Sequence, residues 1–162
     1  MSLTKIERLI LLNQYRLLAT LEPTEARSYE RHVKALENGF ATEYGFLDRL
    51  SAELSEEDCE FVYHALNVYE GMQSSWDRLA DKDGITKDSL AYHGFAGNSE
   101  GPFMSYSRYI VEDLGKYDYL LIGDHNSHRP TGVQYERMIS TWRSFDSSHD
   151  MTSEQIRAVL KA

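Results

Sequence analysis

The chain has 162 residues, of which 41% are hydrophobic and 27% charged, a composition that suits a globular protein with a sizeable core. Its formal net charge is −9, and residues 51–100 carry eleven acids against the three bases Arg78, Lys82 and Lys87. Because contacts to phosphate dominate nucleic-acid affinity, this balance argues against binding to DNA, RNA or anionic membrane surfaces. An acidic region of this kind suits a basic partner protein or a solvated face.

Cysteine usage and hydropathy indicate the compartment. Cys59 is the one cysteine in the sequence, so no intramolecular disulfide forms and a reducing cytoplasm is expected. The apolar run Leu9–Leu12 is too short for the core of a signal peptide or for a membrane span. No cofactor-binding motif occurs, and we therefore expect no cofactor.

The beginning of the chain predicts two helices. Thr4 and Glu7 have the spacing of a capping box, which opens a helix that runs to about Leu21. Thr24 is expected to cap the next helix, which ends at Asn38–Gly39. The apolar stripe of the first helix, which Asn13 interrupts, is formed by Ile6, Leu9, Ile10, Leu17 and Leu21.

The longest helix is predicted in the middle of the chain, after a shorter helical segment around Tyr44–Leu50. Ser55 with Asp58 starts this helix, and DKDG at residues 81–84 breaks it. Its apolar residues recur at spacings of three, four and seven, as one buried face requires. They are Cys59, Val62, Leu66, Tyr69 and Trp76.

The last third predicts three more helices. Pro102 suits the first turn of a helix that Gly115 closes. YDYLLIG at residues 117–123 is a buried connector or a helical turn, because a single strand has nothing to pair with. Capping pairs open the other two helices, Thr131 with Gln134 and Thr152 with Gln155. The buried faces are Phe103, Tyr106, Ile110 and Leu114, then Tyr135, Met138, Trp142 and Phe145. We predict an all-α fold: one domain, residues 1–162, built as a bundle of about six to eight helices without a substantial sheet.

Four stretches resemble the bacterial YfbU family: RLILLNQYRLL at 8–18, GFAGNSE at 94–100, NSHRP at 126–130 and YERMISTW at 135–142. The resemblance runs through the whole chain. It implies a helical fold and a cytoplasmic bacterial protein, in a family without an established biochemical function. It also implies a set of repeated positions, namely Asn13, Gln14, Tyr15, Gly94, Phe95, Gly97, Asn98, Glu100, Tyr106, Arg108, Asn126, Ser127, His128, Pro130, Tyr135, Arg137, Met138 and Trp142. Many relatives carry an aspartate at the position of Ala96, so a catalytic acid there would be missing from this chain.

The stretch DHNSHRP at residues 124–130 has three interpretations. As a metal site it offers Asp124, His125 and His128, but no ligand pair at helical spacing accompanies them, so we expect no metal. As a turn, its asparagine and serine side chains bond nearby backbone and direct the chain into the next helix. As a binding site, His128 and Arg129 lie beside the start of a helix, where backbone amides favour an anion.

Asn13 lies on the apolar stripe of the first helix, where burying an unpaired amide would cost about 1–3 kcal/mol. We therefore expect Asn13 to bond a distant part of the chain, in a polar cluster with Asn98, Glu100, Arg108 and His128. Glu100 is also expected to cap the helix that directly follows it.

No motif fixes a reaction class, since no G-x-S-x-G elbow occurs and Cys59 has no recognisable activating partner. The leading hypothesis is a non-catalytic protein-interaction or regulatory module, able to form a homodimer, with the acidic region 51–100 facing a basic partner. The alternative is a small-ligand or anion-binding protein, or a hydrolase with Glu100 and His128 as an acid–base pair. The candidate ligand-binding residues are Asn13, Asn98, Glu100, Arg108, Asn126, Ser127, His128 and Arg129.

Overall fold

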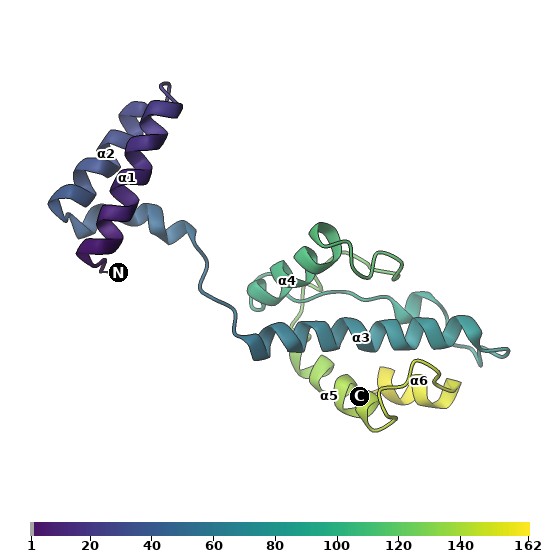
Figure 1. The fold of residues 1–162 in the computed structure, drawn as a ribbon. Helices are drawn as coiled ribbons and strands as arrows, with labels where there is room; N and C mark the ends of the chain where they lie inside the picture. The colour runs from purple at the N-terminus through teal and green to yellow at the C-terminus, as the bar shows by residue number, and fades with distance from the viewer. Residues whose placement is uncertain (1) are drawn as a thin grey trace. The chain divides into compact units, whose positions relative to one another are not determined.

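The computed structural model describes residues 2–162, in which six α-helices form (Figure 1). Their bounds are α1 Lys5–Leu21, α2 Ala26–Asn38, α3 Glu56–Arg78, α4 Gly101–Arg108, α5 Gly132–Arg143 and α6 Ser153–Leu160. Short 3-10 turns occur at Ala41–Glu43, Gly45–Arg49 and Asp88–Leu90, and a π turn at Tyr109–Asp113 extends α4. Over the described range no strand forms, and the β pairing there consists of two isolated bridges. The predicted all-α fold is confirmed.

The chain divides into two compact units, Met1–Glu53 and Leu54–Ala162. Each unit has its own group of buried apolar side chains. A cooperative single domain over residues 1–162 therefore stays a prediction, which calorimetry tests by the number of unfolding transitions.

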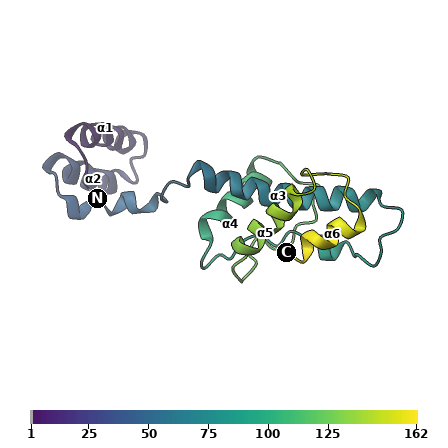
Figure 2. The ribbon, with the colours of Figure 1, turned by 90° about the horizontal axis from the view of Figure 1, so that it is seen from below.

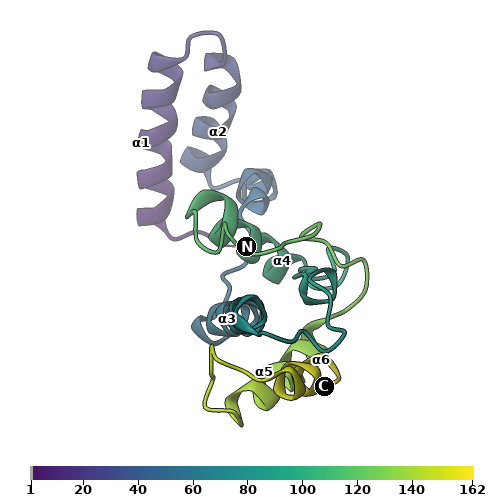
Figure 3. The same cartoon turned by 90° about the vertical axis from the view of Figure 1, so that its right-hand side faces the viewer.

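In the first unit, α1 and α2 form a helical hairpin and lie side by side (Figure 3). The predicted capping box opens α1: the Thr4 hydroxyl accepts the amide of Glu7, and the Glu7 carboxylate accepts the amide of Thr4 at 2.7 Å. Gly39 ends α2 in the left-handed region, with φ 72°, as predicted. Thr24 was wrongly predicted as the cap of α2. The chain turns once more before the helix begins, and Glu25 takes the cap position without a side-chain bond.

The core of the first unit is small. Leu12, Leu36 and Tyr44 are buried, and half-buried apolar side chains pack around them. The ring of Tyr15 lies 4.9 Å from that of His32 and 5.3 Å from that of Phe46, measured between centroids. This aromatic contact joins α1 to α2 and to the following turn. The half-buried members of the core are Leu3, Leu11, Tyr15, Val33, Phe46 and Leu47.

The apolar residues that were predicted to form the buried face of α1 are exposed within the first unit. We call them the α1 face: Ile6, Leu9, Ile10, Leu17 and Leu21, which are between 52% and 75% exposed. α1 turns Leu11, Leu12 and Tyr15 toward α2 instead. The prediction was wrong because α1 carries apolar residues around much of its circumference, so the periodicity fits two faces and α2 covers only one of them.

α3 is the central helix of the second unit, with α4 on one side and α5 and α6 on the other (Figure 1). Figure 2 shows α5 and α6 along α3. The Ser55 hydroxyl accepts the amide of Asp58 at 3.1 Å, the cap that was predicted. The predicted face is also confirmed: Val62, Leu66 and Tyr69 are buried, and Cys59 and Trp76 are half-buried.

Residues 117–123 form a connector rather than a strand, as predicted, but Leu120 is the one residue of this segment that is buried. Buried Gln73 of α3 holds it: the amide nitrogen of Gln73 donates to the carbonyls of Leu90 and Leu121, at 2.9 and 3.2 Å. The Gln73 oxygen accepts the Leu121 amide at 2.7 Å. One side chain thus bonds three backbone groups of two loops, of which the Leu121 carbonyl also accepts the amide of Tyr92 at 3.0 Å.

Candidate functional site

Glu100 joins two parts of the second unit. Its carboxylate accepts the amide of Ala96 at 2.9 Å, the amide of Thr131 at 3.0 Å and the amide of Gly132 at 2.8 Å. Thr131 is the N-cap residue of α5 and Gly132 is its first residue, so the side chain of Glu100 caps α5. Glu100 itself takes the N-cap position of α4 without a side-chain bond. The predicted cap of α4 therefore forms by position only, and the sequence prediction missed the contact with α5, which spans 31 residues of chain.

The anion at the start of α5 is thus the protein's own carboxylate. Burial alone would raise the pKa of Glu100, but the hydrogen bonds from Ala96, Thr131 and Gly132 outweigh it and hold this pKa below its usual value. Gly132 leaves room for the carboxylate, because a Cβ there would lie 3.0 Å from Oε1 of Glu100. Thr131 was wrongly predicted to cap α5 through its own side chain; its hydroxyl donates to the carbonyl of Gly94 at 3.0 Å.

The loops GFAGNSE and NSHRP lie side by side. The amide of Phe95 donates to the carbonyl of His125 at 3.1 Å, and the amide of Ser127 donates to the carbonyl of Phe95 at 3.2 Å. Gly94 adopts φ 78°, and a Cβ built on it would lie 1.8 Å from the His125 carbonyl oxygen. Only glycine fits this approach. The Tyr135 hydroxyl completes the junction with a bond to the Gly94 carbonyl at 2.8 Å.

The structure confirms that DHNSHRP forms a tight turn. Oδ1 of Asn126 accepts the amide of His128 at 3.0 Å and that of Gly97 at 3.1 Å. The Ser127 hydroxyl donates to the carbonyl of Arg129 at 2.6 Å. His128 adopts a left-handed conformation with φ 56°, which is energetically unfavourable for a residue other than glycine. The asparagine bond to the amide of His128 stabilises it.

Of the three candidate metal ligands, Asp124 and His128 lie close together, and His125 lies beside Glu112 instead. Nε2 of His128 lies 3.7 Å from Asp124, and both side chains are exposed. Nε2 of His125 lies 3.5 Å from Glu112, and His125 itself is buried. Burial lowers the pKa of His125, and Glu112 opposes this shift while Arg108 adds to it. In the described part of the chain, no three His, Cys, Asp or Glu side chains gather as a metal site requires.

The predicted polar cluster divides among several partners. Arg108 forms an ion pair with Glu112 at 3.6 Å, and Asn98 is exposed. Within residues 54–162, no hydrogen bond or ion pair links Asn98, Glu100, Arg108 and His128 to one another. Asn13 belongs to the first unit, where it is exposed, and its part in a common cluster stays a prediction.

One hollow does bring predicted ligand residues together. We call it the turn cavity; its volume is about 330 Å³. Asn126, Ser127, His128 and Arg129 line it, and Glu100 does not. The sequence prediction missed His93, which also lines it and whose only signal was its place beside Gly94. The other lining residues are Tyr69, Asp124, Thr131, Gln134 and Tyr135.

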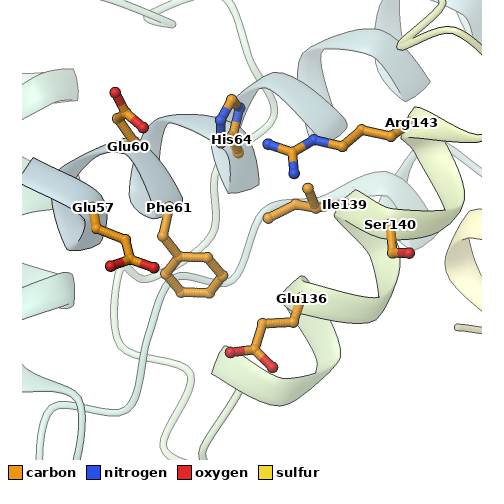
Figure 4. A pocket seen from close by; sticks show the side chains of 8 residues that line it. All are labelled: Glu57, Glu60, Phe61, His64, Glu136, Ile139, Ser140 and Arg143. Atoms are coloured by element: carbon orange, nitrogen blue, oxygen red, sulfur yellow. The ribbon is translucent and has the colours of Figure 1, made fainter.

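A second hollow, the α3–α5 groove, lies between the two helices of that name and has a volume of about 400 Å³. In Figure 4 the carboxylates of Glu57 and Glu136 flank the ring of Phe61, and Arg143 extends toward His64. Burial lowers the pKa of His64, and Arg143 adds to this shift while Glu60 opposes it. The acids of α3 were predicted only as part of an acidic region, because the facing helix is 80 residues further along the chain. The remaining lining residues are Ile139 and Ser140.

Two further observations concern the whole chain. Among residues 2–162, no helix is both long and apolar enough to cross a bilayer. A family model for the YfbU domain matches residues 1–162, which includes both units and all four stretches that carry the resemblance. The chain belongs to the YfbU family.

Proposed function

We propose that this protein is a non-catalytic protein-interaction or regulatory module whose main contact surface is the α1 face. The observation that carries the proposal is a row of five large aliphatic side chains on one helix, each more than half exposed in its unit. Contiguous exposed apolar patches of several hundred Å² mark protein interaction sites, whereas scattered apolar residues do not.

The proposed absence of catalysis is supported by the state of Glu100. A catalytic acid or base needs a proton-transfer partner within hydrogen-bond reach. The oxygens of Glu100 accept three backbone amides that fix the start of α5, so this carboxylate has a structural role to fulfil. His128 lies beside Asp124 instead, on the exposed side of the turn.

We also propose a second contact region, the α3–α5 groove, for a basic segment of a partner. Glu57 and Glu136 flank Phe61 there, so a lysine or arginine side chain would meet two carboxylates and an aromatic face. The acidic surplus of residues 51–100 supports this choice of partner charge. Replacing Glu57 and Glu136 by Gln should weaken partner binding and reduce its dependence on salt.

The test uses tagged full-length protein, in its natural form and as Leu9→Glu with Leu17→Glu, to capture proteins from a bacterial lysate. Proteins held by the natural chain and lost from the variant are then purified and measured against both forms. Lys34→Glu, on the charged outer side of α2, is the matched control and should bind like the natural chain. Equal binding of the same partner by all three forms would contradict the α1 face as the contact surface.

The alternative function is a small-ligand or anion-binding protein, or a hydrolase that acts at the loops around Glu100 and His128. The turn cavity favours it, because four predicted ligand residues, including the cationic Arg129, line one hollow and His93 adds a proton-donating imidazole. Titration with inorganic phosphate, followed by the imidazole resonances, tests this alternative. Saturable shifts of these resonances that disappear in Arg129→Gln would support the alternative function. Resonances that stay unchanged at millimolar phosphate would contradict it.

We further propose a cytoplasmic location without nucleic-acid or membrane partners. The free thiol of Cys59 and the net charge of −9 support these proposals. Cell fractionation tests the location, and a gel shift at low salt tests nucleic-acid binding; retardation of DNA or RNA at moderate salt would contradict the proposal.

A further inference from the structure

The first unit buries too little apolar surface to fold well without a cover. Three buried side chains form its core, whereas the second unit buries eighteen in one cluster. Small domains with a core of this size usually need a disulfide, a metal or association. Cys59 lies outside this unit, so no disulfide serves it.

The α1 face has a symmetry that selects its partner. Asn13 is the midpoint of α1, which runs from Lys5 to Leu21. Leu9 and Leu17 lie four residues before and after Asn13, and Ile6 and Leu21 lie seven before and eight after it. A helix turned end over end about an axis through Asn13 therefore presents nearly the same row of aliphatic side chains.

We infer that a second copy of this chain covers the α1 face, with the two α1 helices antiparallel about a two-fold axis at Asn13. The inference rests on the proposed function, because it names the partner of that surface. In this arrangement Leu9 of each copy packs on Leu17 of the other, and Ile6 packs on Leu21. A two-fold contact of this kind is self-complementary and closes as a dimer.

Asn13 supports a copy of the same chain rather than a different protein. It is exposed, and it lies in the middle of an aliphatic row. An amide carries both donors and an acceptor, so two Asn13 side chains on a two-fold axis satisfy each other. A single polar residue inside an apolar helix contact also fixes register and number of strands, at a cost in affinity.

The helix dipoles favour the antiparallel direction, because the start of one α1 then lies beside the end of the other.

The α1 face gathers five aliphatic side chains that are each between 52% and 75% exposed, and this row suits the apolar centre of a dimer interface. The outer side of α2 does not offer such a surface, because it carries charged residues: Arg27, Glu30, Arg31, Lys34 and Glu37.

The first experiment measures the mass of the full chain by light scattering during size exclusion. The expected mass is twice 18.7 kDa, and Leu9→Glu with Leu17→Glu should lower the dimerisation affinity roughly 100-fold or more, because each copy then buries unpaired charge. Lys34→Glu should remain dimeric. Tryptophan fluorescence shows that the second unit of the variant still folds, since Trp76 and Trp142 both belong to it.

The second experiment tests direction and register by disulfide cross-linking in a Cys59→Ser background. Asn13→Cys should form a dimer under mild oxidation, because residue 13 meets its own copy on the axis. Ile6→Cys should not, since residue 6 lies at opposite ends of the pair. Cross-linking at both positions would show parallel helices and overturn the arrangement.

The outcomes separate this inference from the proposed function. A monomeric natural chain that binds another protein through the α1 face overturns the inference and leaves the proposed function standing. A monomer that binds nothing through this face removes both. A dimer that survives Leu9→Glu with Leu17→Glu, with its mass unchanged on dilution, overturns the inference because another surface then holds the copies together.

Discussion

Replacing Glu100 by Ala should destabilise the second unit without touching the first. The carboxylate accepts the amides of Ala96, Thr131 and Gly132. Removing it leaves three backbone amides without their charged acceptor and the start of α5 without its cap.

The expected loss follows from these bonds. Hydrogen bonds to a charged group contribute about 1.5–3 kcal/mol each in a protected site, and water replaces part of this where the site is partly exposed. Glu100 is half-buried, so we expect a loss of about 3 kcal/mol for Glu100→Ala and about 1.5 kcal/mol for Glu100→Gln, which keeps one acceptor oxygen.

Urea unfolding followed by tryptophan fluorescence measures the change, because both tryptophans, Trp76 and Trp142, lie in the second unit. Asp118→Asn is the matched control: this exposed carboxylate should change the free energy of unfolding by less than about 0.5 kcal/mol. If Glu100→Ala were no more destabilised than Asp118→Asn, the carboxylate would not be the cap of α5 and the reasoning would fail.

The remaining predictions concern the same unit. The pKa of Glu100 is lowered in the folded state, so its contribution to the free energy of unfolding is present above the pKa of an unfolded glutamate and is lost as pH falls through the folded pKa. In Glu100→Gln, the free energy of unfolding should therefore depend less steeply on pH below about pH 5. An unchanged slope of this free energy against pH would contradict the prediction. Gly94→Ala should cost more than about 3 kcal/mol, because its Cβ would lie 1.8 Å from the carbonyl oxygen of His125. Gly84→Ala should cost only about 1 kcal/mol, since φ is 73° there but no atom lies within 4 Å; equal losses would refute the close approach. Gln73→Leu should cost about 2–4 kcal/mol in a thermal or urea melt, because the Leu90 carbonyl and the Leu121 amide lose their partner while the Leu121 carbonyl keeps the amide of Tyr92; a stable variant would show that water replaces the lost bonds.

The helices could be predicted because their signals are local. Thr4 with Glu7, Ser55 with Asp58 and Thr152 with Gln155 each cap a helix within four residues of chain, and each cap forms. The buried face of α3 was equally readable, since one face of that helix is apolar and the other is charged. The apolar stripe of α1 was predicted correctly, but the prediction that it is buried within its unit was wrong. The periodicity of apolar residues identifies a face of a helix and not the element that covers this face.

The candidate site was less predictable because it depends on contacts between distant loops. Both loops were singled out, yet Glu100 reaches α5 across 31 residues, and nothing in the neighbouring sequence specifies that helix. The same limit applies to His93 and to the α3–α5 groove, whose two walls are far apart in the chain. Asn126 and Ser127 were predicted correctly because their side chains bond backbone only two residues away.

A second copy over the α1 face, as inferred above, would make the folding of the first unit, with its three-residue core, depend on protein abundance. If association supplies the missing apolar contacts, the helix content of α1 and α2 rises with the total amount of chain, while α3 to α6 stay folded on dilution. Proteases would then cut the hairpin when the chain is scarce and spare it when the chain is plentiful. The level of expression would itself decide how much of this surface exists in a folded form.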